Sequence, residues 1–427
     1  MSLPVQKRLV RGAALAASAS TLAMGLAACG QAGSGTAGGV SCDASAPGVT
    51  EKEIKLGLTW SDTGDGAASL AAFRGGIDAR LGLANEEEGG IFGRKITYAW
   101  RDDQADQQVN ARVARELVDD EGVFGMMMAP GGSGGSIEWL AEQNVPVTGM
   151  GSDPGWENRG NMFSFYYLGE GANTAWGKLI RELGGTRAAV IAISGSKSNS
   201  DFNRQLAASL LESGVEIVKT YNIAEAITNY EAIADQIKAN RIDTLTGTFL
   251  PAMAVNLLPA LRERGIELKA PVLPLGYDDK LLHNDGASLR NAVIVNQIKP
   301  WQANTPEQRA FLEAMNAYAP QIQPATTDIG VDGYVAADLF LKGLELAGEC
   351  PTRESFIAAL RAVTTYDGGG LIPRPVDLTT NYKEPNSCYS IVRVTPDGTA
   401  FAPLFDAKPL CGDPITPERM NQLLGTA

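Results

Sequence analysis

Residues 124–136 read Phe-Gly-Met-Met-Met-Ala-Pro-Gly-Gly-Ser-Gly-Gly-Ser. This pattern predicts a buried apolar strand, then a glycine-rich loop, then a helix that opens at Ser136. In open α/β sheets, ligands bind at the carboxyl ends of the strands, where such loops lie. Glycines let backbone N–H groups approach a ligand closely, and a helix start favours a carboxylate or another acceptor. We therefore expect Ser133 and Gly134 to contact a ligand.

Other interpretations of this loop compete with that one. No Lys-Ser or Lys-Thr follows the glycines, so the loop is not a phosphate-binding P-loop. Residues 131–135 do match the Gly-x-Ser-x-Gly motif of serine hydrolases. A hydrolase that uses Ser133 would need a later acid, Asp243 or Asp278, and His283 as the base. A glycine-rich connection that binds nothing is the third interpretation.

The composition limits the class of protein. The chain has 427 residues, of which 44% are hydrophobic, which is enough for two domains with their own cores. A formal net charge of −13 argues against a nucleic-acid partner. No long apolar run follows the N-terminal segment, so we expect no transmembrane helix. His283 is the single histidine and no Cys-x-x-Cys or His-Glu-x-x-His pattern occurs, so we expect no metal site, no cofactor and no enzyme.

The N-terminal segment predicts export. Residues 1–28 have a basic start followed by an alanine-rich apolar stretch, which is typical of a secretory signal peptide. Residues 26–29 read Leu-Ala-Ala-Cys and resemble a bacterial lipobox. The resemblance implies cleavage before Cys29 and attachment of a lipid to its sulfur, which would anchor the chain to the outer face of the cytoplasmic membrane. Residues 29–50 are rich in Gly, Ser and Ala and are expected to form a flexible tether.

From residue 53 onwards, strand and helix patterns alternate in two runs. In the first run, strands are expected at 54–58, 95–101, 124–128 and 146–148, with helices between them. In the second run, strands are expected at 188–193, 216–222, 244–249 and 272–275. Two such runs of βαβ units predict an α/β fold of two doubly wound lobes. Further helices are expected at 332–346 and 352–363, and a hairpin at 388–405.

Several motifs resemble one known family. Residues 89–96 read Gly-Gly-Ile-Phe-Gly-Arg-Lys-Ile, Asp102-Asp103 and the Gly/Ser loop follow, and residues 332–337 read Asp-Gly-Tyr-Val-Ala-Ala. In this order they resemble the type I periplasmic binding proteins of the branched-chain amino acid class, which serve ABC importers. The resemblance covers about residues 50–405.

The resemblance implies two Rossmann-like lobes joined by a hinge of three crossings, near Tyr167, Gln297 and Gly370. Lobe 1 would then be 50–167 plus 297–370, and lobe 2 would be 168–296 plus 371–427. It also implies a monomer that closes on a small-molecule ligand and delivers the ligand to the transmembrane subunits of an ABC permease. A ligand sensor on the same fold is the alternative.

The resemblance also implies ligand-binding residues. The first ligand serine falls at Ser133, and the second polar loop falls at 151–153. In amino acid binders these loops hold the ligand carboxylate. The acid that binds an ammonium falls near Tyr277-Asp278. The full set of candidates, aromatic residues included, is Trp60, Ser133, Gly134, Gly151, Ser152, Asp153, Phe202, Phe249, Tyr277 and Asp278, with Ser200 and Leu250 as neighbours that fit as well.

Two departures from the family pattern, Asp153 and the absence of the family's Tyr-Gly in the second-lobe loop, argue against a standard branched-chain amino acid as the ligand. Asp153 stands where Ser or Thr is common, and its carboxylate would repel a ligand carboxylate at short range. Trp60 and Trp156 are expected in loops, where they suit a cleft that holds a larger or aromatic ligand. Tyr166 and Phe249 could equally pack in the core. The expected ligands are therefore an amino acid-like compound, an amide or an aromatic acid.

Four cysteines remain beside Cys29: Cys42, Cys350, Cys388 and Cys411. In an exported protein they are expected to form disulfides, and three connectivities are possible. With the lobes that the resemblance implies, a bridge between lobes would restrict closure. We therefore predict Cys42–Cys350 and Cys388–Cys411.

Overall fold

The structure is a computed structural model that describes residues 46–64, 67–129, 131–193, 197–223, 229–248 and 250–426. The predicted signal peptide (1–28), the predicted lipidation site Cys29 and most of the predicted tether (29–50) lie outside the described residues, as does Phe249. Within those described ranges, no helix is long and apolar enough to cross a membrane.

The first sheet has five parallel strands in the order β2-β1-β3-β4-β5. The strands β1, β3, β4 and β5 are largely buried, as expected where helices cover both faces of a parallel sheet, whereas the edge strand β2 is mostly half-buried. β3 lies at the centre, so the glycine-rich loop leaves the middle of the sheet. The strands are β1 (Glu53–Trp60), β2 (Lys95–Asp102), β3 (Met126–Met128), β4 (Val147–Gly149) and β5 (Met162–Phe163).

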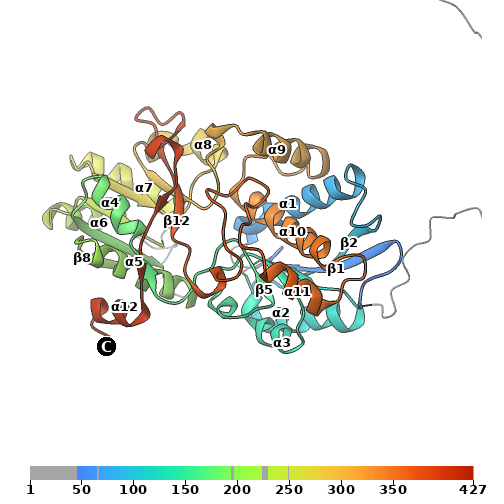
Figure 1. Ribbon diagram of the computed structural model, residues 1–427. Coiled ribbons are helices and arrows are strands. Elements are labelled where there is room, and N and C mark those ends of the chain that lie inside the picture. Colours follow the sequence, from blue (N-terminus) through green and yellow to red (C-terminus); the bar gives the residue numbers. More distant parts are fainter. Residues whose placement is uncertain are drawn as a thin grey trace, which may run out of the picture. The chain divides into compact units, whose positions relative to one another are not determined.

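Two 20-residue helices, α1 (Ala67–Glu86) and α10 (Asp328–Ala347), lie side by side against this sheet (Figure 1). Glycines allow their close approach. A Cβ on Gly76 would lie 1.9 Å from the Gly330 carbonyl oxygen, and a Cβ on Gly333 would lie 1.8 Å from the Phe73 carbonyl oxygen. The crossing therefore fixes the position of the first turns of α10.

The other helices of this first lobe follow local signals. α2 (Gln107–Arg115) begins after Asp106, whose carboxylate accepts hydrogen bonds from the first-turn amides, and it continues as a π-helical turn over Glu116–Asp120. α9 (Pro306–Tyr318) and α11 (Arg353–Arg361) each begin with a capping box. α3 (Ile137–Glu142) follows the glycine-rich loop.

The second sheet carries the second lobe, in the order β13-β12-β11-β10-β9-β7-β8. Five of its strands are parallel, and β12 and β13 return as an antiparallel hairpin at one edge. The strands are β7 (Arg187–Ile193), β8 (Glu216–Ile223), β9 (Thr244–Gly247), β10 (Ala270–Leu273), β11 (Val293–Asn296), β12 (Cys388–Val394) and β13 (Phe401–Pro403). The helices are α4 (Ala175–Glu182), α5 (Lys197–Glu212), α6 (Tyr230–Ala239), α7 (Pro251–Glu263), α8 (Asp279–Leu289) and α12 (Pro417–Leu424). The prediction of two doubly wound α/β lobes is confirmed.

The chain segment after Gly370 still contacts the first lobe. Val376 exchanges two backbone hydrogen bonds with Tyr366, and the Asn381 side chain donates to the Ser164 carbonyl. The Asn386 amide then donates to the carbonyl of Tyr167, at the first predicted crossing. These contacts favour a third crossing near Asn386 instead of Gly370, and the exact lobe boundaries stay a prediction.

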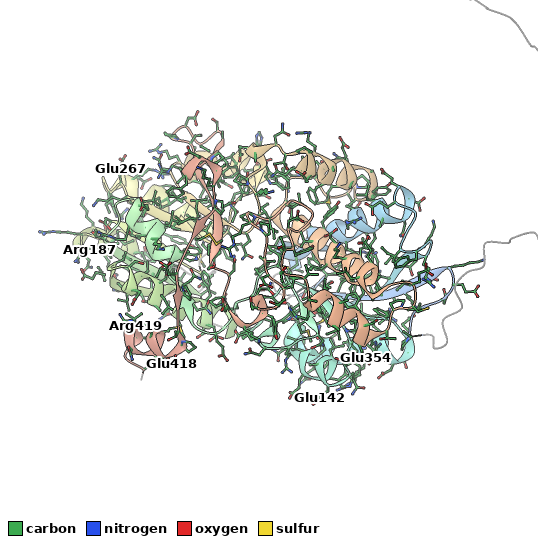
Figure 2. All side chains as sticks on the ribbon, in the orientation of Figure 1. Glu142, Arg187, Glu267, Glu354, Glu418 and Arg419 are labelled. Atoms are coloured by element: carbon green, nitrogen blue, oxygen red, sulfur yellow. A yellow bond between two sulfur atoms is a disulfide. The ribbon has the colours of Figure 1, made fainter. Side chains whose placement is uncertain are left out.

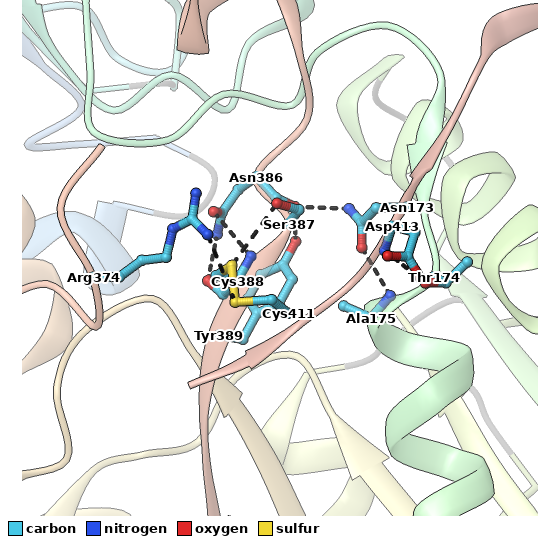
Figure 3. Close-up of a disulfide and its surroundings, with 10 residues drawn as sticks. All are labelled: Asn173, Thr174, Ala175, Arg374, Asn386, Ser387, Cys388, Tyr389, Cys411 and Asp413. Carbon is cyan, nitrogen blue, oxygen red and sulfur yellow. Dashed lines mark hydrogen bonds between the residues drawn. A yellow bond between two sulfur atoms is a disulfide. The ribbon is translucent and has the colours of Figure 1, made fainter. Parts of the chain in front are cut away.

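A disulfide joins Cys388 to Cys411, as predicted, and both residues lie in the second lobe (Figure 3). It links β12 to β14 (Leu410–Cys411), which pairs antiparallel with it. Close by, β6 (Ala172–Asn173) pairs with β15 (Pro414–Ile415), and the Asn173 side chain donates to the Asn386 carbonyl. Cys350 is disulfide-bonded as well, but Cys42 lies outside the described residues, so the second pairing stays a prediction.

Candidate functional site

Because the strands of the first sheet are parallel, the loops that follow them meet at one edge. The buried carboxylate of Asp103 joins three of these segments. The Ser61 hydroxyl donates to its Oδ1 (2.7 Å), and the Asn110 side chain (3.0 Å) and the Gly132 amide (3.2 Å) donate to its Oδ2. The Ala105 amide is a fourth donor (3.1 Å). Asp103 thus holds the glycine-rich loop against the loop after β1.

The neighbouring carboxylate, Asp102, holds the loop after β1 from the other side. It accepts hydrogen bonds from the amides of Asp62, Thr63 and Gln104 and from the Thr63 hydroxyl. Burial raises the pKa of Asp102, but hydrogen bonds from Thr63 and from the Gln104 and Asp62 amides outweigh it, so the pKa lies below the usual value. In the sequence this Asp pair is recognisable only as a family motif, and its positioning role is not visible there.

The glycine-rich loop brings Ser133 next to Asp153. Ser133 begins a short 3₁₀ turn (Ser133–Gly135) and is fully buried, and its hydroxyl donates to Asp153 Oδ2 at 3.2 Å. The other oxygen of Asp153 accepts from the Gly155 amide at 2.8 Å. A Cβ on Gly134 would lie 2.9 Å from Gln107 Nε2 and 3.2 Å from Asp153 Oδ2. The predicted residues Ser133, Gly134 and Asp153 therefore meet, and a carboxylate lies beside the serine.

The same contacts give the serine hydrolase interpretation no support. The Ser133 hydroxyl donates to Asp153, while His283 is exposed on α8 of the second lobe. Asp243 precedes β9, at the amino end of the strand, where it accepts from Thr186 and the Arg187 amide and pairs with Lys269 at 3.1 Å. Each candidate is thus engaged in a local structural contact or exposed to solvent.

The loops after β4 and β5 lie together. Gly151 forms a parallel bridge with Tyr167, and its amide donates to the Ser164 hydroxyl at 3.2 Å. Tyr166, 7% exposed, lies beside Ser152. Burial raises the pKa of the Tyr166 phenol well above its usual value, nearby carboxylates raise it further, and a hydrogen bond from Ser152 opposes them.

Those carboxylates are Asp328 and Asp332, in the first two turns of α10. Asp332 is 9% exposed. Burial raises the pKa of Asp328 to about 6, and the charge of Asp278 contributes to this shift. Burial also raises the pKa of Asp332 well above its usual value, with a further contribution from Asp328. From the sequence, Asp332 was interpreted only as part of a motif and neither acid was predicted as a site residue, although two aspartates four residues apart on a mostly apolar helix were a visible signal.

The second lobe brings fewer of the predicted residues to this edge. Tyr277 is 1% exposed, and its hydroxyl donates to Gln302 at 2.7 Å and accepts from the Trp301 amide at 2.6 Å. Asp278 caps α8 by accepting from the Leu281 amide, and its charge reaches Asp328. Phe202 packs edge-on against Trp176 in the core of the second lobe.

Of the two tryptophans expected in loops, Trp60 ends a strand, whereas Trp156 does lie in the connection after β4, in a short 3₁₀ turn (Pro154–Trp156). Trp60 is the last residue of β1 and is 2% exposed, because it packs 4.9 Å from Trp100 and is covered by the Arg74 guanidinium. Trp156 is fully buried in an apolar cluster with Ile137 and Leu140. Burial of indole area in the core therefore explains Trp156 without a ligand, and the assignment of Trp60 to the ligand site stays an untested prediction.

The structure also shows what kind of site this edge can form. In the part of the chain that the structure describes, no group of three or more His, Cys, Asp or Glu side chains could hold a metal ion. The edge offers backbone amides, hydroxyls and carboxylates, which suit recognition of a small polar molecule by hydrogen bonds and charge.

The chain is similar to a known family and to solved structures. A family model described as periplasmic binding protein matches residues 53–399. A fatty acid ABC transporter substrate-binding protein from Thermomonospora curvata is 18% identical, with a TM-score of 0.67 over 84% of this chain and 93% of that chain. A solute-binding protein from R. palustris in complex with benzoate is 18% identical, with a TM-score of 0.68 over 86% of this chain and 99% of that chain. No curated protein matches the sequence significantly.

A third structure, the branched-chain amino acid transporter substrate-binding protein of Streptococcus pneumoniae in complex with isoleucine, is 16% identical and has a TM-score of 0.65. The alignment covers 83% of this chain and 99% of that chain. At these identities the likeness to solved structures establishes the fold. It does not identify the ligand of this chain.

Proposed function

The chain belongs to the periplasmic binding protein family, and we propose that it is an exported solute-binding protein that captures a small molecule between its two lobes and delivers it to the membrane subunits of an ABC importer. The observation that carries this proposal is the polar edge of the first lobe, where Asp103 fixes the glycine-rich loop beside Ser133 and Asp153. Such a fixed constellation suits recognition, because little rotamer freedom is lost when a ligand binds.

The second lobe supports a closing mechanism. Its Asp278 lies within electrostatic reach of Asp328, and Asp279 accepts a hydrogen bond at 2.6 Å from Thr326, just before α10. A solute that contacts both lobes would favour the closed arrangement in proportion to its extra contacts there. The closed form would then present the surface that the permease recognises. Binding and closure are the whole function on this account, with no bond made or broken.

We also propose that Cys29 carries the lipid anchor and that the following residues tether the lobes to the outer face of the membrane. The support is the lipobox-like run at 26–29 after a signal-like segment. Cys29→Ser is expected to release the chain from the membrane fraction into the soluble exported fraction. Retention of the variant in the membrane fraction contradicts the anchor.

The test of the function combines a ligand screen with a measure of closure. The purified chain is screened by thermal shift against amines, amino acids, amides, carboxylic acids and sugars, and each hit is followed by small-angle X-ray scattering. A bound solute is expected to raise the melting temperature and to reduce the radius of gyration. Cells that lack the chain should then lose uptake of that solute. Binding with normal uptake in such cells would favour a sensor, and no binding in any class contradicts the proposal.

A further inference from the structure

Two carboxylates of α10 in the first lobe have no counter-charge among the residues that the structure describes. Asp328 and Asp332 are four residues apart on α10 and therefore project from the same face of the helix. Asp332 is 9% exposed, and among the described residues it has no hydrogen-bond or ion-pair partner. Asp328 accepts one bond, from the amide of Ile329 next to it. By contrast, the labelled carboxylates Glu142, Glu267 and Glu354 lie on the surface in Figure 2.

The groups that face this pair add negative charge or none. The charges of both carboxylates act on the buried phenol of Tyr166, and the charge of Asp278 at the start of α8 acts on Asp328. The basic residues of the adjacent helix α1 are engaged elsewhere. Arg80 pairs with Asp338 at 2.9 Å and Glu88 at 3.0 Å, and Arg74 donates to Tyr98 and covers Trp60.

Helix geometry does not account for the pair. A negative charge in the first turn of a helix is stabilised by the helix dipole, which is sufficient reason for Asp328. Asp332 lies in the second turn, beyond the reach of that effect, and it is the more buried of the two. Burying an unpaired carboxylate is unfavourable unless the group takes up a proton or binds a cation. Groups of this kind concentrate at functional sites.

We propose that Asp328 and Asp332 bind the positive charge of the transported solute, which is therefore an organic cation, such as an alkylammonium or amidinium compound, and not a carboxylate. The inference rests on the proposed function and names the class of its ligand. The carboxylate of Asp153 beside Ser133 agrees with it, because that loop then disfavours a ligand carboxylate. On this proposal the positive group of the solute is the counter-ion of the two aspartates, and Tyr166 and Ser152 lie near that group.

Matched pairs of compounds test the charge of the ligand. Isothermal titration calorimetry on the purified chain compares benzylammonium with benzoate, 3-methylbutylammonium with 3-methylbutanoate, and isoleucine as a zwitterion. We expect at least one of the ammonium compounds to bind more tightly than its matched carboxylate and more tightly than isoleucine. Tighter binding of benzoate or isoleucine than of both ammonium compounds overturns the inference, yet leaves the solute-binding function in place. Absence of binding by every compound tested overturns the inference, and failure of the wider screen as well overturns the proposed function.

Variants then locate the charge. Asp332→Asn is expected to weaken binding of the ammonium compound by at least about tenfold, the usual cost of losing a bond between charged groups. Asp328→Asn should act in the same direction. Glu345→Gln, on the same helix but exposed, is the matched control and should leave affinity unchanged. Unchanged affinity in folded Asp332→Asn and Asp328→Asn overturns the inference. If Asp332→Asn does not fold, the affinity of Asp328→Asn, a change at the less buried residue, decides whether the inference holds.

Discussion

Two pairs of aspartates lie at the polar edge of the first lobe, and they are in opposite states. Asp102 and Asp103 accept hydrogen bonds from eight donors in total, four each, and join the loops around them. Asp328 and Asp332 share a single acceptor bond, from the Ile329 amide, among the described residues. Hydrogen bonds lower the pKa of Asp102, whereas burial raises the pKa of both acids on α10.

The difference indicates that the first pair holds the loops in place and that the second pair is available to bind a ligand. A carboxylate whose lone pairs are filled by the protein stabilises the fold and has little left to offer a ligand. A buried carboxylate without a partner makes the empty protein less stable and gains most when a cation arrives. Substitutions of the first pair should therefore cost stability, and substitutions of the second pair should cost affinity.

Asp103→Ala should have the largest effect. It leaves the Ser61 hydroxyl, the Asn110 amide group and the Gly132 amide without their shared acceptor, and breaking a buried charged network costs about 3 kcal/mol. Urea unfolding measures the loss. Asp120→Ala, at an exposed position, is the control and should stay within about 0.5 kcal/mol of the unsubstituted protein. A loss below about 1 kcal/mol in Asp103→Ala would show that the network does not organise the loops.

Gly333→Ala should have the second-largest effect. It should displace Asp328 and Asp332, because Gly333 lies on the same helix, α10. Its Cβ would lie 1.8 Å from the Phe73 carbonyl oxygen, so α10 must move away from α1 at a cost of about 2 kcal/mol. We expect a lower melting temperature and weaker ligand binding together. Gly160→Ala places its Cβ where no atom lies within 4 Å and should change neither quantity. Full ligand affinity in Gly333→Ala would show that the position of α10 is not critical.

Asp328→Asn should have the smallest effect on stability, and with the opposite sign. The folded-state pKa is raised from 3.8 to about 6, so the proton-linked stability is present below pH 3.8 and is lost as pH rises through about 6. The amide has no charge to bury. The variant should therefore become more stable than the unsubstituted protein between pH 4 and pH 7, by about 1 kcal/mol at pH 7; the full pKa shift corresponds to about 3 kcal/mol, which the partial exposure of Asp328 to solvent reduces. Urea unfolding at a series of pH values measures this gain. A variant whose free energy of unfolding falls relative to that of the unsubstituted protein as pH rises contradicts it.

The sequence predicted the parts that depend on local pattern. The alternation of strand and helix gave two α/β lobes, and the glycine run marked the loop after β3 that holds Ser133 beside Asp153. The Cys388–Cys411 pairing also followed from the lobe assignment. These features depend on periodicity, on turn residues and on which segments belong together.

The parts that failed depend on tertiary contacts. Trp60 was expected in a loop that borders a cleft. Its ring is buried instead by Arg74 from α1 and Trp100 from β2, which are distant in sequence. The role of Asp103 depends on donors from three separate segments. The acids of α10 become unusual only when the helix packs with Tyr166 and Asp278 around them. No local pattern contains that information.

Proton release on binding tests the central claim most directly. Calorimetric titration of the best-binding ammonium compound at pH 6.5, in two buffers of different ionisation enthalpy, gives the number of protons exchanged. Burial raises the pKa of both carboxyl groups above the usual value, and a bound cation lowers it again by favouring the charged form, so binding should displace part of the protons that the empty site holds. We predict net release of protons in the unsubstituted protein and a smaller release in Asp332→Asn. Zero exchange or proton uptake would contradict the assignment of these two carboxylates to a cationic ligand.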